Sequence, residues 1–209
     1  MKTILFQGDS ITDAERNYSV DSKRGLGYPT LISADMGYRF PGEFSFINRG
    51  VSGNRIVDVY SRIKIDIINL RPDVMTLLIG VNDVWHELSR QNGVDSDKFA
   101  RICSMLIEEI HAALPDCRIV LLEPFVLRGT ATEENWDYFR TEVEKRAARV
   151  REIAGKYSLD FIPLQNRFDK LCEKAPADYW LFDGVHPTSA GHGMIAAELT
   201  PVLESILLK

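Results

Sequence analysis

Five short apolar segments, each followed by a stretch of helical periodicity, constrain the fold of this chain more than any other feature. The apolar segments lie at residues 4–6, 44–48, 74–79, 118–122 and 159–162. The segment at 74–79 is almost wholly apolar, as is typical of a central strand covered on both faces. Alternating strands and helices predict a parallel sheet with right-handed crossovers and a helix layer on each face. We therefore expect an α/β protein with a five-stranded parallel sheet in three α/β/α layers.

Helical patterns fill the intervals between these segments. A first helix is expected to begin near Tyr28-Pro29, since proline suits a first turn, where its missing N–H costs nothing. Apolar residues recur at helical spacing over residues 56–67, 99–113 and 136–154. A last helix is predicted from Ser189, with a kink or a restart imposed by Pro201. Without a repeat, a low-complexity tract or a linker, the pattern predicts a single domain over residues 1–209.

Composition and charge argue against several classes of partner. A net charge of -5 without a basic run disfavours nucleic acid and anionic membranes. No apolar stretch approaches the roughly 20 residues of a membrane span, and residues 1–8 resemble a strand rather than a signal peptide. The cysteines at 103, 117 and 172 lack ligand spacing, so we expect no disulfide, no zinc and a cytoplasmic location. The scattered acidic residues share no ligand spacing either, so no metal is expected.

Polar turns that contain glycine follow four of the five predicted strands. These turns are Gly8-Asp9-Ser10, residues 48–54, residues 80–83 and, after a longer excursion, residues 183–187. The carboxyl ends of parallel strands share one edge of the sheet, so the four turns are expected to converge there and form a site.

The residue types in these turns suit acyl transfer. Ser10 is the candidate nucleophile, His186 the general base and then general acid, and Asp183 the residue that orients the imidazole. The backbone N–H groups of Ser10 and Gly53 and the side-chain amide of Asn82 are candidate donors to an oxyanion. Taken singly, the serine could be a strand-end cap and the histidine an ordinary loop residue. Their convergence at one edge favours the catalytic interpretation.

At these positions the sequence resembles the SGNH hydrolases, also called the GDSL esterase/lipase family. The similarity rests on four blocks in the family's order: residues 8–11, Gly53, residues 80–83 and residues 183–186. Ile11 stands where the family name has leucine, and the turn lacks the second glycine of the G-x-S-x-G elbow. The resemblance implies a flavodoxin-like fold and a serine esterase without a cofactor. Homo-oligomers are common in the family, and the sequence leaves the number of subunits open.

Within the family, residues 79–85 and 183–192 are most similar to carbohydrate acetyl esterases such as acetyl-xylooligosaccharide esterases. This similarity implies a small-molecule ester substrate, an acetylated oligosaccharide derived from plant polysaccharide. A lysophospholipase or thioesterase remains an alternative within the enzymes. A sugar-binding module without catalytic activity is an alternative of another class.

Several residues beside the four turns are candidates for substrate contact. They are Asp9, Arg55, Trp85, His86 and Phe182. Each has a structural alternative: the aspartate could stabilise its turn, the arginine could cap its own helix, and the aromatic side chains could be core or pocket wall. His192, at the start of the predicted last helix, is expected to be structural.

Overall fold

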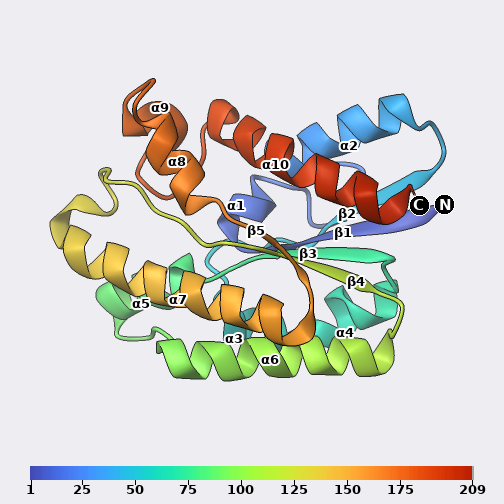
Figure 1. The fold of residues 1–209 in the computed structure, drawn as a ribbon, viewed down its shortest axis with the longest axis horizontal. Coiled ribbons are helices and arrows are strands. Elements are labelled where there is room, and N and C mark those ends of the chain that lie inside the picture. The colour runs from blue at the N-terminus through green and yellow to red at the C-terminus, as the bar shows by residue number, and fades with distance from the viewer. Residues whose placement is uncertain (209) are drawn as a thin grey trace.

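The computed structural model describes residues 1–208 and contains a five-stranded, wholly parallel sheet (Figure 1). The strands are β1 (Lys2–Gly8), β2 (Phe44–Asn48), β3 (Val74–Leu78), β4 (Arg118–Leu122) and β5 (Asp160–Ile162). Their order across the sheet is β2-β1-β3-β4-β5. This is the flavodoxin-like order, and the expected five-stranded parallel sheet is confirmed.

Helices cover both faces of the sheet (Figure 1). On one face lie α2 (Tyr28–Arg39), α8 (Gln165–Leu171) and α10 (Ser189–Leu207). On the other lie α3 (Ile56–Ser61), α4 (Ile63–Asp66), α6 (Ser96–Ala113) and α7 (Trp136–Tyr157). Shorter or peripheral elements are α1 (Ser10–Asp13), η1 (Ile68–Leu70), α5 (Val81–Arg90), η2 (Glu133–Asn135) and α9 (Ala177–Trp180). The three-layer α/β/α architecture is therefore also as predicted.

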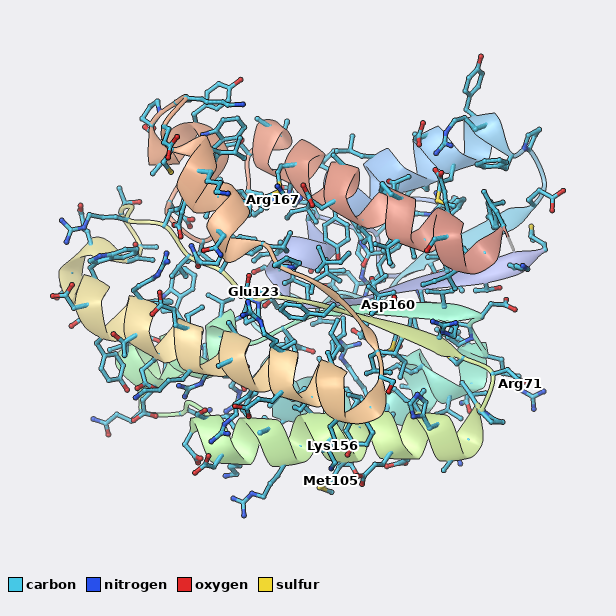
Figure 2. All side chains as sticks on the ribbon, viewed as in Figure 1. Arg71, Met105, Glu123, Lys156, Asp160 and Arg167 are labelled. Atoms are coloured by element: carbon cyan, nitrogen blue, oxygen red, sulfur yellow. The ribbon has the colours of Figure 1, made fainter. Side chains whose placement is uncertain are left out.

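Alternating side chains of the strands supply two separate cores, one on each face of the sheet. In β1, Ile4 and Phe6 belong to the cluster under α2 and α10, whereas Leu5 belongs to the cluster over α3 and α6. The side chains of strands and helices fill both spaces between the layers (Figure 2). Burial on both faces explains why the central strands have nearly continuous apolar sequences.

Two helical segments differ from the sequence-based expectation. The predicted continuous helix over 56–67 is wrong, because the chain breaks into α3 and α4 at Arg62, whose φ is -112° and ψ 16°. Of the kink or restart expected at Pro201, the restart is wrong, since α10 runs without interruption through that residue. Leu199 and Leu203 are both buried on either side of the proline, so packing outweighs the missing backbone hydrogen bond.

The strand order determines where a site can form. β1 lies between β2 and β3, and the chain continues from β2 to the opposite side of β1. The strand order therefore reverses at β1, which is called a topological switch point. Ligands of open α/β sheets bind outside the carboxyl ends of the strands at such a point. The turns after β1, β2 and β3 all open onto this point. Among the helices formed by residues 1–208, none has both the length and the apolar character needed to cross a bilayer.

Candidate active site

Ser10 follows a point where β1 lies very close to β3. A Cβ on Gly8 would lie 2.4 Å from the carbonyl oxygen of Leu78 in β3, so only glycine fits there. Asp9 then caps α1, because its Oδ1 accepts the N–H of Ile11 over 3.0 Å. Ser10 is consequently the first residue of α1, at the carboxyl end of the strand.

The side chains of Ser10, His186 and Asp183 form a continuous chain of hydrogen bonds. Ser10 Oγ lies 2.9 Å from His186 Nε2, and His186 Nδ1 lies 2.7 Å from Asp183 Oδ2. The carboxylate accepts a hydrogen bond from Nδ1–H, which leaves Nε2 as the acceptor for the serine hydroxyl. The structure thus brings together the three side chains that the sequence suggested for acyl transfer.

The turn that carries Asp183 and His186 is held by the loop after β4. Gly184, at a φ of +95°, accepts the backbone N–H of Leu127 through its carbonyl over 2.8 Å. The carbonyl of Asp183 accepts the N–H of Ala131 over 2.9 Å. This supporting loop could not be predicted from the sequence, because it contacts the site through its backbone, which leaves no residue-type signal.

Electrostatics favour an ion pair between His186 and Asp183 once the imidazole is protonated. The hydrogen bond to Asp183 raises the pKa of His186 above its ordinary value, against the opposing effect of burial. Burial pushes the pKa of Asp183 upward, but hydrogen bonds from the His186 side chain and backbone bring it below its ordinary value. The carboxylate therefore stays charged and can stabilise an imidazolium at His186.

Three candidate hydrogen-bond donors lie in the turns after β1, β2 and β3. Within residues 1–208 neither the N–H of Ser10 nor that of Gly53 has a backbone acceptor. Asn82 Nδ2 donates one hydrogen to the carbonyl of Asn54 over 3.2 Å, which orients the amide and leaves its second hydrogen available. Gly53 adopts a φ of +79°, a conformation that favours glycine. This arrangement can stabilise a developing oxyanion.

The loop that carries Gly53 is anchored by two side chains that the sequence analysis did not single out. Asp13 Oδ2 accepts the N–H of Ser52 over 3.0 Å and its hydroxyl over 2.9 Å. Arg62 Nε donates to Asn54 Oδ1 over 2.8 Å from the break between α3 and α4. These contacts depend on tertiary structure, so neither residue shows a local pattern in the sequence.

Two buried carboxyl groups lie behind the turns. Burial raises the pKa of both Asp9 and Asp83 to about 7. Asp83 accepts the backbone N–H of Ile56 at the start of α3 over 3.1 Å, so it joins α5 to the end of the Gly53 loop. Asp9 is 1% exposed and has no open surface toward a ligand. We therefore assign Asp9 to the structure of its turn rather than to substrate contact.

A cavity of about 400 Å³ opens beside the serine, within the size range of small-molecule sites. Its walls include Ser10, Ser52, Phe182, His186, Ser189 and His192. Phe182 is 59% exposed and stacks on the His186 ring with a centroid distance of 5.6 Å. Of the five candidates for substrate contact, Phe182 is the one that lines this cavity.

The remaining candidates lie outside that cavity. Trp85 has its ring centroid 5.8 Å from that of His186 and packs against the core. His86 lies next to Gly53, where a Cβ would be 3.9 Å from its Nε2. Arg55 is engaged by Asp58 and by Asn92, so it caps α3 and holds its own loop. Its contacts favour the structural alternative considered for this residue.

A hydrogen-bonded Ser-His-Asp triad beside backbone and amide donors defines the class of serine hydrolases. Residues 6–194 match the GDSL-like lipase/acylhydrolase family, and the chain belongs to this family. It is a carboxylic ester hydrolase, and the resemblance expected from the four sequence blocks is confirmed.

Individual relatives agree with this assignment. The chain is 27% identical to the acetylxylan esterase of Geobacillus stearothermophilus over 92% of its own length and 90% of the relative's. The crystal structure of that organism's acetylxylan esterase Axe2 aligns with a TM-score of 0.86 at 27% identity, covering 96% of this chain and 93% of Axe2. Catalytic mutants of Axe2 with a serine or an aspartate replaced by alanine have also been solved. A GDSL-like protein from Parabacteroides merdae aligns with a TM-score of 0.89 at 33% identity, covering 96% of this chain and 94% of that protein.

Proposed function

We propose that this esterase removes acetyl groups from acetylated sugars, with Ser10 as the nucleophile. The observation that carries the proposal is the hydrogen bond from Ser10 to His186 at 2.9 Å, continued to Asp183 at 2.7 Å. A serine hydroxyl is a weak nucleophile unless a base accepts its proton, and this arrangement provides the base and its orienting partner.

The proposed reaction has two halves. Ser10 Oγ attacks the ester carbonyl while its proton passes to His186 Nε2, and the oxyanion accepts hydrogen bonds from Ser10, Gly53 and Asn82. Collapse breaks the bond between the carbonyl carbon and the alcohol oxygen, which takes the proton from His186. Water then attacks the acyl-serine with His186 as base, releasing acetate and restoring the hydroxyl.

The substrate is proposed from the cavity and from the relatives. The cavity of about 400 Å³ is much larger than an acetyl group, so it has room for the alcohol part of the ester. Its walls combine polar groups, such as Glu15 and Ser52, with the apolar surfaces of Leu26 and Phe182. Such a mixture suits a sugar, which presents hydroxyl groups and C–H faces together. The similarity to an acetylxylan esterase supports the same substrate class.

Acetate release from acetylated xylo-, manno- and pectin-type oligosaccharides tests the proposal, with p-nitrophenyl acetate, butyrate and longer esters measured in parallel. We expect turnover of at least one acetylated sugar and rates that fall as the acyl chain lengthens. Ser10→Ala should abolish turnover of every ester while the fold is retained. Rates that climb with chain length would favour a lysophospholipase or thioesterase, and unchanged turnover in the variant would exclude Ser10 as nucleophile.

A further inference from the structure

His192, near the start of α10, lies in the wall of the cavity beside Ser10 and His186. Its ring packs against residues that follow α1: a Cβ on Gly27 would lie 2.9 Å from His192 Cε1, and the ring of Tyr28 lies 6.3 Å away between centroids. The side chain is 7% exposed. One edge of this imidazole is therefore fixed tightly against the protein.

The hydrogen bond at that edge determines the tautomer. The backbone N–H of Tyr28 donates to His192 Nδ1 over 3.2 Å. A nitrogen that accepts a hydrogen bond carries a lone pair, so the ring hydrogen of the neutral imidazole is on Nε2. Burial, and secondly the nearby His186, lower the pKa of His192 to about 4. The ring is consequently neutral at ordinary working pH, and Nε2–H is a fixed donor.

This donor has no partner among residues 1–208. Among the hydrogen bonds formed by residues 1–208, none uses His192 Nε2, whereas Nδ1 is occupied. The Nε2 atom is also not among the fully buried polar atoms that lack a partner, so it keeps accessible surface, and the ring that carries it lines the cavity. A neutral donor held rigidly in the wall of a binding cavity can recognise an oxygen acceptor at little entropic cost.

We propose that His192 is a specificity-determining residue whose Nε2–H donates a hydrogen bond to an oxygen of the substrate's alcohol part. The inference rests on the proposed function for the identity of that alcohol as a sugar. The alcohol is assigned to this cavity because His186, which must protonate the leaving oxygen, forms another of its walls. A sugar places hydroxyl and ring oxygens on nearly every carbon and so provides suitable acceptors.

The variant His192→Asn separates recognition from structure. Its Oδ1 can accept the N–H of Tyr28 in place of Nδ1, but none of its atoms reaches the position of Nε2. His192→Gln is the matched variant, since its longer amide retains an N–H donor near that position. Each enzyme is assayed with an acetylated xylo-oligosaccharide and with phenyl acetate, whose alcohol part has no oxygen besides the ester. Glycerol monoacetate and propyl acetate form a second pair that does not depend on sugar hydrolysis.

For His192→Asn we expect kcat/KM on the oxygen-rich esters to fall about tenfold, mainly through KM, as for the loss of a hydrogen bond. The kcat/KM on phenyl acetate and propyl acetate should change less than about twofold. His192→Gln should retain part of the wild-type preference for the oxygen-rich esters. Equal losses on both kinds of ester, or no loss on either, would overturn the inference. If wild type hydrolyses glycerol monoacetate but no acetylated sugar, the proposed substrate fails while the glycerol pair still tests His192.

A measurement on the wild-type protein covers the case in which the asparagine variant does not fold. In protein labelled with 15N-histidine, His192 should be in the Nε2–H form, and its Nε2 resonance should move when an alcohol that inhibits hydrolysis competitively, xylose or glycerol, is added. A resonance that stays in place at an inhibitory concentration of that alcohol would overturn the inference.

Discussion

Arg62 Nε donates to Asn54 Oδ1 over 2.8 Å, and the carbonyl of Asn54 in turn accepts from Asn82 over 3.2 Å. The guanidinium thus positions both the loop of Gly53 and the amide of Asn82, although it does not touch the reacting atoms. Arg62→Lys keeps the charge but loses the planar set of donors. We expect kcat to fall about tenfold with KM changed less than about twofold, since the affected donors act in the transition state.

The matched control is Arg101→Lys, on the exposed face of α6. It should leave kcat and the melting temperature unchanged. A lower melting temperature with wild-type kcat in Arg62→Lys would mean that Arg62 stabilises the fold without positioning the donors.

We expect Asp183 to control both the rate and its pH dependence. The active form has a neutral His186, whose pKa is raised by Asp183, so kcat/KM should rise with pH through an apparent pKa above 6.5. In Asp183→Asn we expect kcat to fall by about 10²–10⁴. The rise of kcat/KM with pH should move to lower pH, because the imidazolium loses its carboxylate partner. Asp178→Asn, at an exposed position, is the control. If kcat/KM of Asp183→Asn rises with pH over the same range as in wild type, the proposed role of the Asp183–His186 pair is contradicted.

We expect Asp83 to make the free energy of unfolding depend on pH. The unfolded chain releases this proton near 3.8, whereas burial raises the pKa in the folded protein to about 7. Deprotonation therefore favours unfolding between these values, and the free energy of unfolding falls as pH rises through this interval. Asp83→Asn keeps an acceptor for Ile56 and removes the charge.

We expect the free energy of unfolding of Asp83→Asn, relative to wild type, to increase from pH 4 to pH 8 in urea titrations. Asp116→Asn, at an exposed position, should show no such trend. A relative stability that is flat or falls with pH would show that Asp83 is charged in the folded protein at neutral pH.

Replacing Gly53 tests whether its backbone N–H donates to the oxyanion. A Cβ there has room, with His86 3.9 Å away, so the cost of Gly53→Ala comes from its φ of +79°. Forcing alanine into this conformation costs about 1–2 kcal/mol, and relief of the strain would rotate the N–H away from the oxyanion. We expect kcat to fall at least about tenfold with KM changed less.

Gly155→Ala in α7 is the matched substitution, because its Cβ would meet nothing within 4 Å. It should raise stability by about 0.5–1 kcal/mol in thermal or urea unfolding and leave kcat unchanged. Full activity in Gly53→Ala would exclude its N–H as an essential donor.

The sheet and the strand-end residues could be predicted from the sequence because both follow from local patterns. Apolar runs of strand length mark the sheet, and Ser10, Asn82 and His186 follow such runs in polar turns. The topology of a parallel sheet then brings these turns to one edge. The four sequence blocks of the family pointed to the same residues.

What could not be predicted depends on contacts between distant segments. The helix break at Arg62 accompanies its hydrogen bonds to Gln7 and Asn54. The helix through Pro201 persists because of packing on both sides of it. His192 was expected to be structural, and its bond to Tyr28 agrees with that, but its open Nε2 depends on a cavity that no local pattern defines.

The most direct test of the account is covalent labelling of the nucleophile. The wild-type protein is treated with a fluorophosphonate ester until hydrolysis stops, and the adduct is located by peptide mass spectrometry. We predict one adduct per chain, on Ser10, formed in proportion to the loss of activity and greatly slowed in His186→Ala. Complete inactivation with the adduct on another residue, or with Ser10 unmodified, would contradict the account.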